Sequence, residues 1–552
     1  MGERRRVQAT LAVVALILAL SGGVAGARSA RGRAARPMAL QRSVDRAILR
    51  LKALAPRRQD PSTVDCSVTA ATTSNVNLDC DDPGYPGNAV TPNNEENIVV
   101  DPADPNHMIV SSNDYSSCCD EWYTTFDGGH NWQAGDMSHG TGATGSDPVT
   151  TIDPVHGTAV HSSLNYIIND NGEACDGHVV VSVSTDGGIV WNEPIIVYPG
   201  SGCDSDPVQV FNDKEWITTD TNPGSPAYGR IYLTWTRFLS NYGITQESPI
   251  WESHSDDGGY TWSTAQEISG NSKKYCTYQT QGNPSECDED QGSVPTIGPD
   301  GTVTVAFINE QNQAAWESGE MFENQYMVVQ SHDGGVTWSA PVHVVDMEDG
   351  STDYPVNVDG RQTLTGYQVR VWAPGNVAAD PNTGQLALVF SDNRNGSHDV
   401  PHPQTNTDVF LMTSNDGVTW YGPRQVTRDL SDQWFPWVAY DPAVPGRLGI
   451  AYHGRNLADT AVYNTYLAEG TALGSFTITK VTNKLSRPRQ SLWFRAGPGV
   501  PSCRHCATFH GDYIGVAYGS DGSANVVWTD MRRLMTFDVL TGYTENTFFS
   551  RI

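Results

Sequence analysis

Four arginines occupy one equivalent position in a repeating sequence pattern. Each follows a short β-branched or aromatic run, as in Thr234-Trp235-Thr236-Arg237 and Ser391-Asp392-Asn393-Arg394. The set is Arg237, Arg394, Arg455 and Arg532. A guanidinium group forms paired hydrogen bonds with a carboxylate, so convergent arginines could bind an acidic ligand.

Acidic residues gather at the starts of the first strands of the same repeating pattern, whereas the arginines follow its second strands. They are Glu95-Glu96, Asp147, Asp213-Lys214-Glu215, Asp290, Asp432 and Asp512-Tyr513, with Trp216, Trp434 and Tyr513 alongside. Carboxylic acids and a tyrosine hydroxyl are groups that transfer protons in catalysis. Asp512, Tyr513 and Glu215 are therefore the candidate catalytic residues.

A recurring hairpin pattern must position these residues. Two short strands flank a turn such as Asp-Pro or Asp-Gly, in which proline presets φ and glycine or aspartate tolerates the left-handed region. The pattern occurs seven times, around residues 98–112, 151–161, 216–235, 296–307, 380–390, 441–452 and 519–528. No long segment shows helical periodicity, so the sequence predicts an all-β protein.

A second element of eight residues follows the first five hairpins. The first copy reads Thr125-Phe126-Asp127-Gly128-Gly129-His130-Asn131-Trp132, and the fifth is one residue shorter. The Asp and Trp pairs are Asp127 and Trp132, Asp186 and Trp191, Asp257 and Trp262, Asp333 and Trp338, and Asp416 and Trp420. We expect the carboxylate to accept backbone N–H groups, the glycines to supply positive φ, and the indole to pack onto the sheets.

These elements resemble the Asp box, or bacterial neuraminidase repeat, of sialidase-like β-propellers. The resemblance covers residues 94–552 and implies that each box is a structural turn between the third and fourth strands of a blade. A loop with one carboxylate lacks the six or more oxygens that calcium takes, so no metal is expected in the boxes. Seven hairpins predict seven four-stranded blades, whereas the likeness to sialidases implies six; we expect seven.

Strand alternation then fixes which face could carry chemistry. The ends of second strands and the starts of first strands share one face, and the boxes lie on the opposite one. Three interpretations of the arginines and acids on that face remain open. They are ion pairs joining neighbouring blades, a site for a ligand carboxylate with a neighbouring acid for proton transfer, or a Ca²⁺ site in the acidic ring. No cofactor is required, although Ca²⁺ would fit.

The resemblance also implies a mechanism. Sialidases bind the sugar carboxylate with three arginines and use a tyrosine nucleophile paired with a glutamate, together with an aspartic acid/base. On this pattern Tyr513, Glu215 and Asp512 are candidates by position. The Arg-Ile-Pro motif of the family is absent, and Glu95-Glu96-Asn97-Ile98 stands in that region.

The N-terminal part of the chain has the features of an export signal. Arg4-Arg5-Arg6 precede an apolar run at 9–20 and a small-residue cleavage site at Ala25-Gly26-Ala27. We expect a signal peptide at 1–27, a basic leader or prosegment at 28–60, a disulfide-containing segment at 61–93 and the propeller at 94–552. An uncleaved anchor is the alternative.

Ten cysteines fit an oxidising, extracellular location. The nearest pairs in sequence are Cys66 with Cys80, Cys276 with Cys287, and Cys503 with Cys506. We expect these to be disulfides. For Cys503 and Cys506, a redox pair or half of a zinc site is the alternative.

Charge excludes some partners. Of 34 lysines and arginines, 13 lie in residues 1–60, which hold only three of the 63 acidic residues. The remainder is strongly acidic, and it would repel nucleic acid and anionic membranes. The sequence thus predicts a secreted, sialidase-like propeller, either an exo-sialidase-type glycoside hydrolase acting on extracellular glycans or a non-catalytic propeller that binds glycan, glycoprotein or another protein.

Overall fold

The structure is a computed structural model of the 552-residue chain. It describes residues 64–552 apart from 65, 80–92, 115–119, 141–142, 172, 278–284, 312–323, 351–352, 357–361, 368, 373–374, 399–401, 457–458, 489–490, 492–508 and 538–539. The expected signal peptide and basic leader lie outside the described residues. Within them the protein is all β, with no α-helix and hence no helix able to span a membrane.

Seven antiparallel sheets, each with at least four strands, form the fold. Blades 1 to 3 are β3–β6 (Asn93–Val100, Met108–Asp114, Asp120–Thr125, Asn131–Asp136), β7–β10 (Thr144–Asp153, Thr158–Ile168, Ala174–Ser184, Ile195–Tyr198) and β11, β12, β14, β15 (Gln209–Thr219, Ile231–Asn241, Ile250–Ser255, Gln266–Glu267). Blades 4 to 6 are β16–β19 (Asp290–Ile297, Val303–Asn309, Gln325–Ser331, Val342–Asp346), β20–β23 (Asn376–Ala379, Leu386–Asp392, Asp408–Ser414, Trp420–Gln425) and β24–β27 (Gln433–Tyr440, Arg447–Asn456, Asp459–Thr471, Thr477–Lys480). Blade 7 contains β28, β29 and β32 (Gly515–Tyr518, Ala524–Asp530, Asn546–Arg551).

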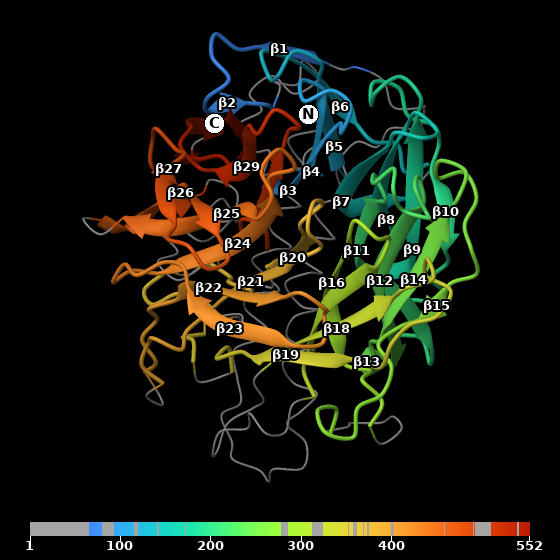
Figure 1. The fold of residues 1–552 in the computed structure, drawn as a ribbon. Coiled ribbons are helices and arrows are strands. Elements are labelled where there is room, and N and C mark those ends of the chain that lie inside the picture. The colour runs from blue at the N-terminus through green and yellow to red at the C-terminus, as the bar shows by residue number, and fades with distance from the viewer. Residues whose placement is uncertain are drawn as a thin grey trace.

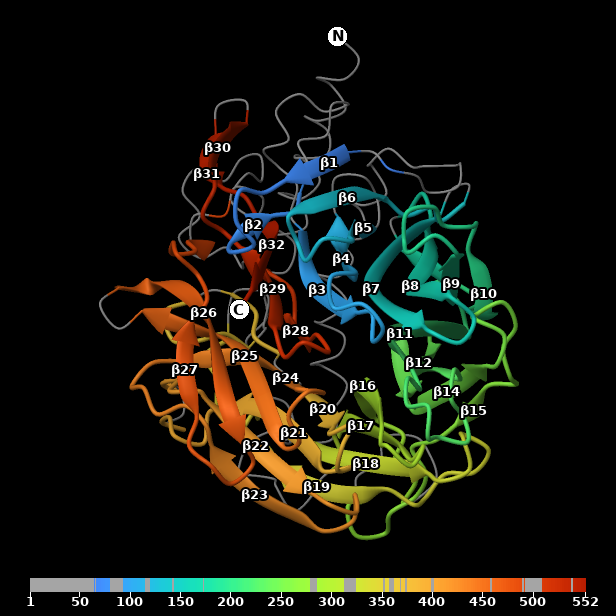
Figure 2. The ribbon, with the colours of Figure 1, turned by 45° about the horizontal axis from the view of Figure 1, so that its top comes forward.

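The blades form a closed ring, which makes the protein a seven-bladed β-propeller (Figures 1 and 2). The first strand of each blade is innermost and contacts the first strands of its neighbours, from β3 through β28 and back to β3. Side chains buried between successive sheets form the core, such as Ala387, Val389, Val438 and Ile450 between blades 5 and 6. The expectation of seven blades is confirmed, and the six-blade alternative is wrong.

An N-terminal strand closes the ring. β2 (Val76–Asn77) pairs with β32 and supplies the fourth strand of blade 7, while β1 (Cys66–Thr69) adds a fifth strand to blade 1. The buried Asp79 accepts hydrogen bonds from Tyr123 of blade 1 and Asn546 of blade 7. Within the segment 61–93, β1 and β2 therefore contribute to the propeller sheets.

The innermost strands of five blades share a bulge near the axis. Their registers shift where a residue takes positive φ, and these residues are Glu95, Asp147, Lys214, Gly292 and Phe435. A bulge bends its strand and redirects the neighbouring side chains. In these five blades, the bulge therefore turns the residues that precede it in the first strand relative to the rest of the blade.

The eight-residue elements form the turns between third and fourth strands in blades 1 to 5. In the fourth copy, Asp333 Oδ1 accepts the Thr337 amide at 2.8 Å, and the Trp338 indole donates to the Gly335 carbonyl at 3.2 Å. Gly334 and Gly335 have φ of 75° and 89°. The hydrogen bonds and positive φ values that we expected for this turn are therefore present.

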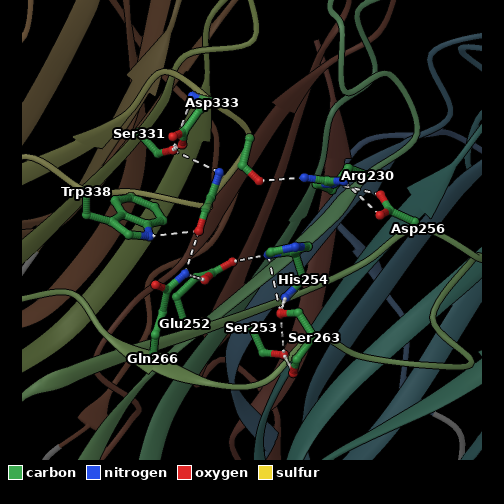
Figure 3. A network of polar contacts seen from close by, with 12 residues as sticks. Arg230, Glu252, Ser253, His254, Asp256, Ser263, Gln266, Ser331, Asp333 and Trp338 are labelled. Carbon is green, nitrogen blue, oxygen red and sulfur yellow. Dashed lines mark hydrogen bonds and ion pairs between the residues drawn. The ribbon is translucent and has the colours of Figure 1, made fainter.

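Each of these turns also contacts the preceding blade. Figure 3 shows Arg230 of blade 3 beside the fourth turn, where its guanidinium donates to the Gly334 carbonyl at 2.6 Å and pairs with Asp256. Thr158 of blade 2 donates in the same way to Gly258 of the third turn. The turns thus join adjacent blades on the face opposite the ends of the second strands.

Two disulfides lie within the described residues. Cys276–Cys287 confirms one expected pair, and Cys175–Cys203, which was not among our expected pairs, joins β9 to the segment before β11. Cys66 is also disulfide-bonded. Its expected partner Cys80 and the pair Cys503–Cys506 lie outside the described residues.

Candidate active site

Polar residues from five parts of the chain meet around the axis, on the face where the first strands begin. They form the axial cluster, which consists of Glu95, Asp147, Lys214, Glu215, Arg370, Asp512 and Tyr513. The bulges of β3, β7 and β11 supply Glu95, Asp147 and Lys214. The cluster therefore exists only because blades 1, 2, 3 and 7 adjoin the axis.

Lys214 is the central cation of the axial cluster. Its ammonium lies 3.2 Å from Glu95 Oε1, 3.6 Å from Asp147 Oδ2 and 3.8 Å from Asp512 Oδ2. Burial opposes the charged form of Lys214, but these three carboxylates outweigh burial and raise its pKa. Lys214 therefore stays protonated across the physiological range.

Arg370 is the second cation. It comes from the long connection between β19 and β20, and its guanidinium pairs with Asp512 Oδ2. Asp512 is 2 % exposed and thus contacts both cations of the cluster. Asp512 thus links Lys214 to Arg370.

Glu215 has the opposite surroundings. It is buried, and neither carboxylate oxygen accepts a hydrogen bond from another described residue. Burial first, and then the nearby charge of Asp147, raise the pKa of Glu215 well above its usual value. These surroundings favour the protonated form of Glu215.

Tyr513 lies among the acids of the cluster. The Lys214 ammonium sits over its ring, 4.5 Å from the centroid. Burial raises the pKa of Tyr513 well above 10, and Glu95, Asp147, Glu215 and Asp512 raise it further. These surroundings disfavour the phenolate form.

Aromatic side chains pack against one another beside the cluster. The Trp216 ring centroid lies 4.6 Å from that of Trp437 and 5.2 Å from that of Tyr513, so blades 3, 6 and 7 meet there. Val294 of blade 4 joins the same apolar cluster. Lys214 and Asp147 keep a small exposed area, 14 % of each side chain, and are more exposed than Glu95, Arg370 and Asp512.

The structure brings the three candidate catalytic residues together. Glu215 and Asp512 both act on the Tyr513 hydroxyl electrostatically. Of the other acids at strand starts, Asp432 pairs with Arg455, and Asp290 accepts a hydrogen bond from Asn309. Trp434 is buried against Tyr367 and His510.

The four predicted arginines each contact a carboxylate of their own blade. Arg394 pairs with Asp392, Arg532 with Asp530, Arg455 with Asp432 and Arg237 with Glu247. Each guanidinium also lies over an aromatic ring, such as that of Phe410 for Arg394 at 4.6 Å. Two of them also reach the preceding blade, where Arg394 donates to the Asp346 carbonyl and Arg532 to Asn483.

Arg370 was missed in the sequence. It lies in a connection that belongs to no repeat, so no equivalent position in another blade marked it. In the sequence, Lys214 is distinguished only by its two acidic neighbours, Asp213 and Glu215. Its positive φ is shared with Glu95 and Asp147, and an alignment of the strand starts would have placed the three together.

Comparisons with known proteins return structural likeness only. No protein-family model matches the chain, and no curated protein matches its sequence. An α-L-arabinofuranosidase from Fusarium graminearum is 12 % identical over 73 % of this chain and 98 % of its own, with a TM-score of 0.43. An ulvan lyase has 10 % identity, coverages of 84 % and 94 %, and a TM-score of 0.46.

An intramolecular trans-sialidase from Ruminococcus gnavus is also similar in structure. It is 11 % identical, and the match covers 71 % of this chain and 95 % of that protein, with a TM-score of 0.37. At such identities the likeness concerns the fold alone. The function must therefore be argued from the axial cluster.

Proposed function

We propose that this protein is a glycoside hydrolase whose active site is the axial cluster. The observation that carries the proposal is the contrast between Glu215 and Asp512. Glu215 is a buried carboxyl group with a raised pKa and no hydrogen-bond partner among the other described residues, and Asp512 is a carboxylate beside Lys214 and Arg370. Two acids in opposed environments are the arrangement that provides a proton donor and an ionised partner at the same pH.

The surroundings suggest a role for each residue. Glu215 would protonate the leaving-group oxygen, because burial and the nearby charge of Asp147 raise its pKa and favour the protonated form. Asp512 would act as the ionised carboxylate, as nucleophile or as base toward water. Tyr513 is disfavoured as a nucleophile because its phenolate would stand among four carboxyl groups, and we assign it a positioning role through its hydroxyl.

Charge restricts the substrate. The cluster contains more carboxyl groups than cations, and both cations already contact carboxylates. An added sugar carboxylate would compete with these contacts and meet repulsion. A neutral glycoside therefore suits the cluster better than a sialoside. Exo-sialidase activity is the other possibility, and the glycoside panel described below includes a sialoside to test it.

The remaining parts of the proposal concern identity and location. We identify the five turns as Asp boxes of a sialidase-like propeller, because the Asp carboxylate accepts a backbone amide in all five and the Trp indole donates to a glycine carbonyl in every copy except that of Trp191. We also propose that the protein is exported and acts on extracellular glycans. The disulfides Cys175–Cys203 and Cys276–Cys287 support an oxidising location.

Hydrolysis of a panel of fluorogenic glycosides by the purified protein tests the proposal. We expect turnover of at least one neutral glycoside and little or none of a sialoside. Glu215→Gln keeps the shape of the side chain and removes the proton donor. It should lower kcat/KM by roughly 10²–10⁴-fold, as for loss of a general acid, with the protein still folded.

Glu310→Gln is the matched control. Burial and nearby acidic residues raise the pKa of Glu310 to about 8, yet it follows β17 outside the axial cluster. This variant should keep full activity. The proposal fails if no glycoside is hydrolysed, or if Glu215→Gln is as active as the wild type.

Closure of the site favours a second candidate, a non-catalytic glycan-binding propeller. Asp512 and Tyr513 are only 2 % and 4 % exposed, so a ligand would first meet the more exposed Lys214 and Asp147. In that case the panel would give no turnover, and calorimetry would detect binding of an oligosaccharide. Lys214→Ala would then weaken binding.

A further inference from the structure

A second group of ligating side chains lies on the same face but outside the axial cluster. Glu348 and Asp353 belong to the connection between β19 and β20, and His398 to the connection between β21 and β22. One ligand atom from each lies within 4.8 Å of the other two. The three residues come from two loops that are 40 or more positions apart in the sequence, so the fold itself brings them together.

The imidazole of His398 is oriented by a backbone group. Its Nε2 lies 3.0 Å from the carbonyl oxygen of Asn393, which can only accept a hydrogen bond. Nε2 therefore carries a proton, and in neutral imidazole Nδ1 must then present its lone pair. Metal-binding histidines are typically held in this way, with the second nitrogen donating to a carbonyl or carboxylate.

That lone pair faces two carboxylates. Nδ1 lies 2.7 Å from Asp353 Oδ1 and 3.6 Å from Glu348 Oε2. A proton on Nδ1 would pair the imidazole with these carboxylates, whereas a metal cation among the three groups would accept a lone pair from each.

Buried hydrogen bonds hold the two loops that carry the ligands. Asn393 is fully buried, and its side chain donates to the backbone of Asp353 and accepts the amide of Asn406. Its own amide donates to the Glu348 carbonyl at 3.0 Å. The second oxygen of Asp353 accepts the Gly350 amide at 2.7 Å. A set of ligands held by such partners is pre-arranged, as outer-shell groups arrange metal sites.

The geometry points to a site for a divalent transition-metal cation, most simply Zn²⁺, bound by Glu348, Asp353 and His398. A tetrahedral zinc ion with bonds of about 2.0 Å separates its ligand atoms by about 3.3 Å, and the observed 2.7 Å and 3.6 Å bracket this value. An imidazole among the ligands favours zinc over Ca²⁺, which takes oxygen ligands. Three protein ligands leave a fourth position for water.

Zinc titration of the full-length protein tests the inference. The untagged protein is stripped with a chelator and dialysed, and Zn²⁺ is then added in competition with a chromophoric chelator. We expect one equivalent of bound zinc and a higher Tm on binding. His398→Ala should weaken binding by at least about 100-fold, the upper end of the effect of losing an outer-shell partner.

His343→Ala is the matched control. His343 lies 2.9 Å from Asp346 on the same blade, but that pair has no third ligand among the described residues. This variant should bind zinc like the wild type. If His398→Ala fails to fold, Glu348→Gln on the more exposed ligand replaces it, with the same expected loss.

Three results would overturn the inference. They are the absence of stoichiometric zinc binding, zinc binding that neither His398→Ala nor Glu348→Gln weakens, and binding of Ca²⁺ in preference to Zn²⁺. The first would identify the group as an imidazolium–carboxylate ion pair that ties two loops together. Because the readouts are metal content and Tm, they do not depend on whether the axial cluster is catalytic.

Discussion

At the scale of single residues, Arg394 tests whether the arginines of this face are structural. Its guanidinium makes several hydrogen bonds to Asp392, whose side chain is completely buried. Arg394→Ala leaves that carboxylate without its cation, and it should lower the free energy of unfolding by about 3 kcal/mol, as for a broken buried ion pair. Denaturant unfolding measures the loss.

Arg428→Ala is a suitable control, because Arg428 is exposed in the connection between β23 and β24. This change should alter stability by less than about 0.5 kcal/mol. An Arg394→Ala protein with unchanged stability but lost glycan binding would instead favour the ligand-binding interpretation of the four arginines.

The buried acids make stability depend on pH in an unusual direction. Burial raises the pKa of Glu545 to about 8, although Asn94 and Ser491 donate hydrogen bonds to it. Above pH 4.5 the unfolded chain loses this proton, whereas the folded protein keeps it until about pH 8. The contribution is therefore fully present below pH 4.5 and is lost as the pH rises toward 8.

We expect Tm to fall between pH 5 and pH 8, with up to about 1.4 kcal/mol per pH unit from each such group. Glu545→Gln should flatten this slope, because the amide does not titrate. A Tm that rises across this range in the wild type, or an unchanged slope in the variant, would contradict the assignment.

At the scale of elements, the Trp residues of the eight-residue turns differ in burial. Trp191 is fully buried and lies at the edge of the His161 ring, whereas Trp338 is only partly buried. Trp191→Ala should cost about 3–5 kcal/mol of stability, as for a large buried aromatic side chain. Trp338→Ala should cost less. Equal losses, measured by thermal unfolding, would show that burial does not set the contribution of this position.

The hairpins and these turns could be predicted because their chemistry is local. Asp-Pro and Asp-Gly turns fix strand reversals, and Asp333 finds its amide partners within four residues. The closing strand β2 could not be predicted, because two residues carry no strand pattern and their partner Phe549 lies at the other end of the chain. The bulges likewise depend on how neighbouring blades meet at the axis.

At the scale of the whole molecule, β2 closes the ring. Val76 and Asn77 pair with β32, and Asn75 connects to Ser550 and Arg532 of blade 7. Removal of residues 1–79 exposes an edge of blade 7 and should lower Tm by several degrees. A protein lacking only residues 1–63, which retains β1 and β2, should keep the Tm of the full chain. Equal values for the two truncations would contradict a closing role.

The candidate site could be predicted in part, because the repeated strand pattern extends to some of its residues. The sequence places Glu215, Asp512 and Tyr513 near the starts of first strands, and strand alternation then puts these starts on one face. Arg370 and the ligand group at Glu348, Asp353 and His398 lie in long connections, where no repeat constrains position. Their roles depend on contacts across the ring that no local pattern records.

A crystal structure of Glu215→Gln with a bound neutral oligosaccharide tests the central claim most directly. We expect a sugar ring beside Lys214, Asp147 and Trp216, with a glycosidic oxygen next to residue 215 and the anomeric carbon facing Asp512. Density for the sugar at Arg237, Arg394, Arg455 or Arg532 instead, with the axial cluster unchanged, would contradict the central claim.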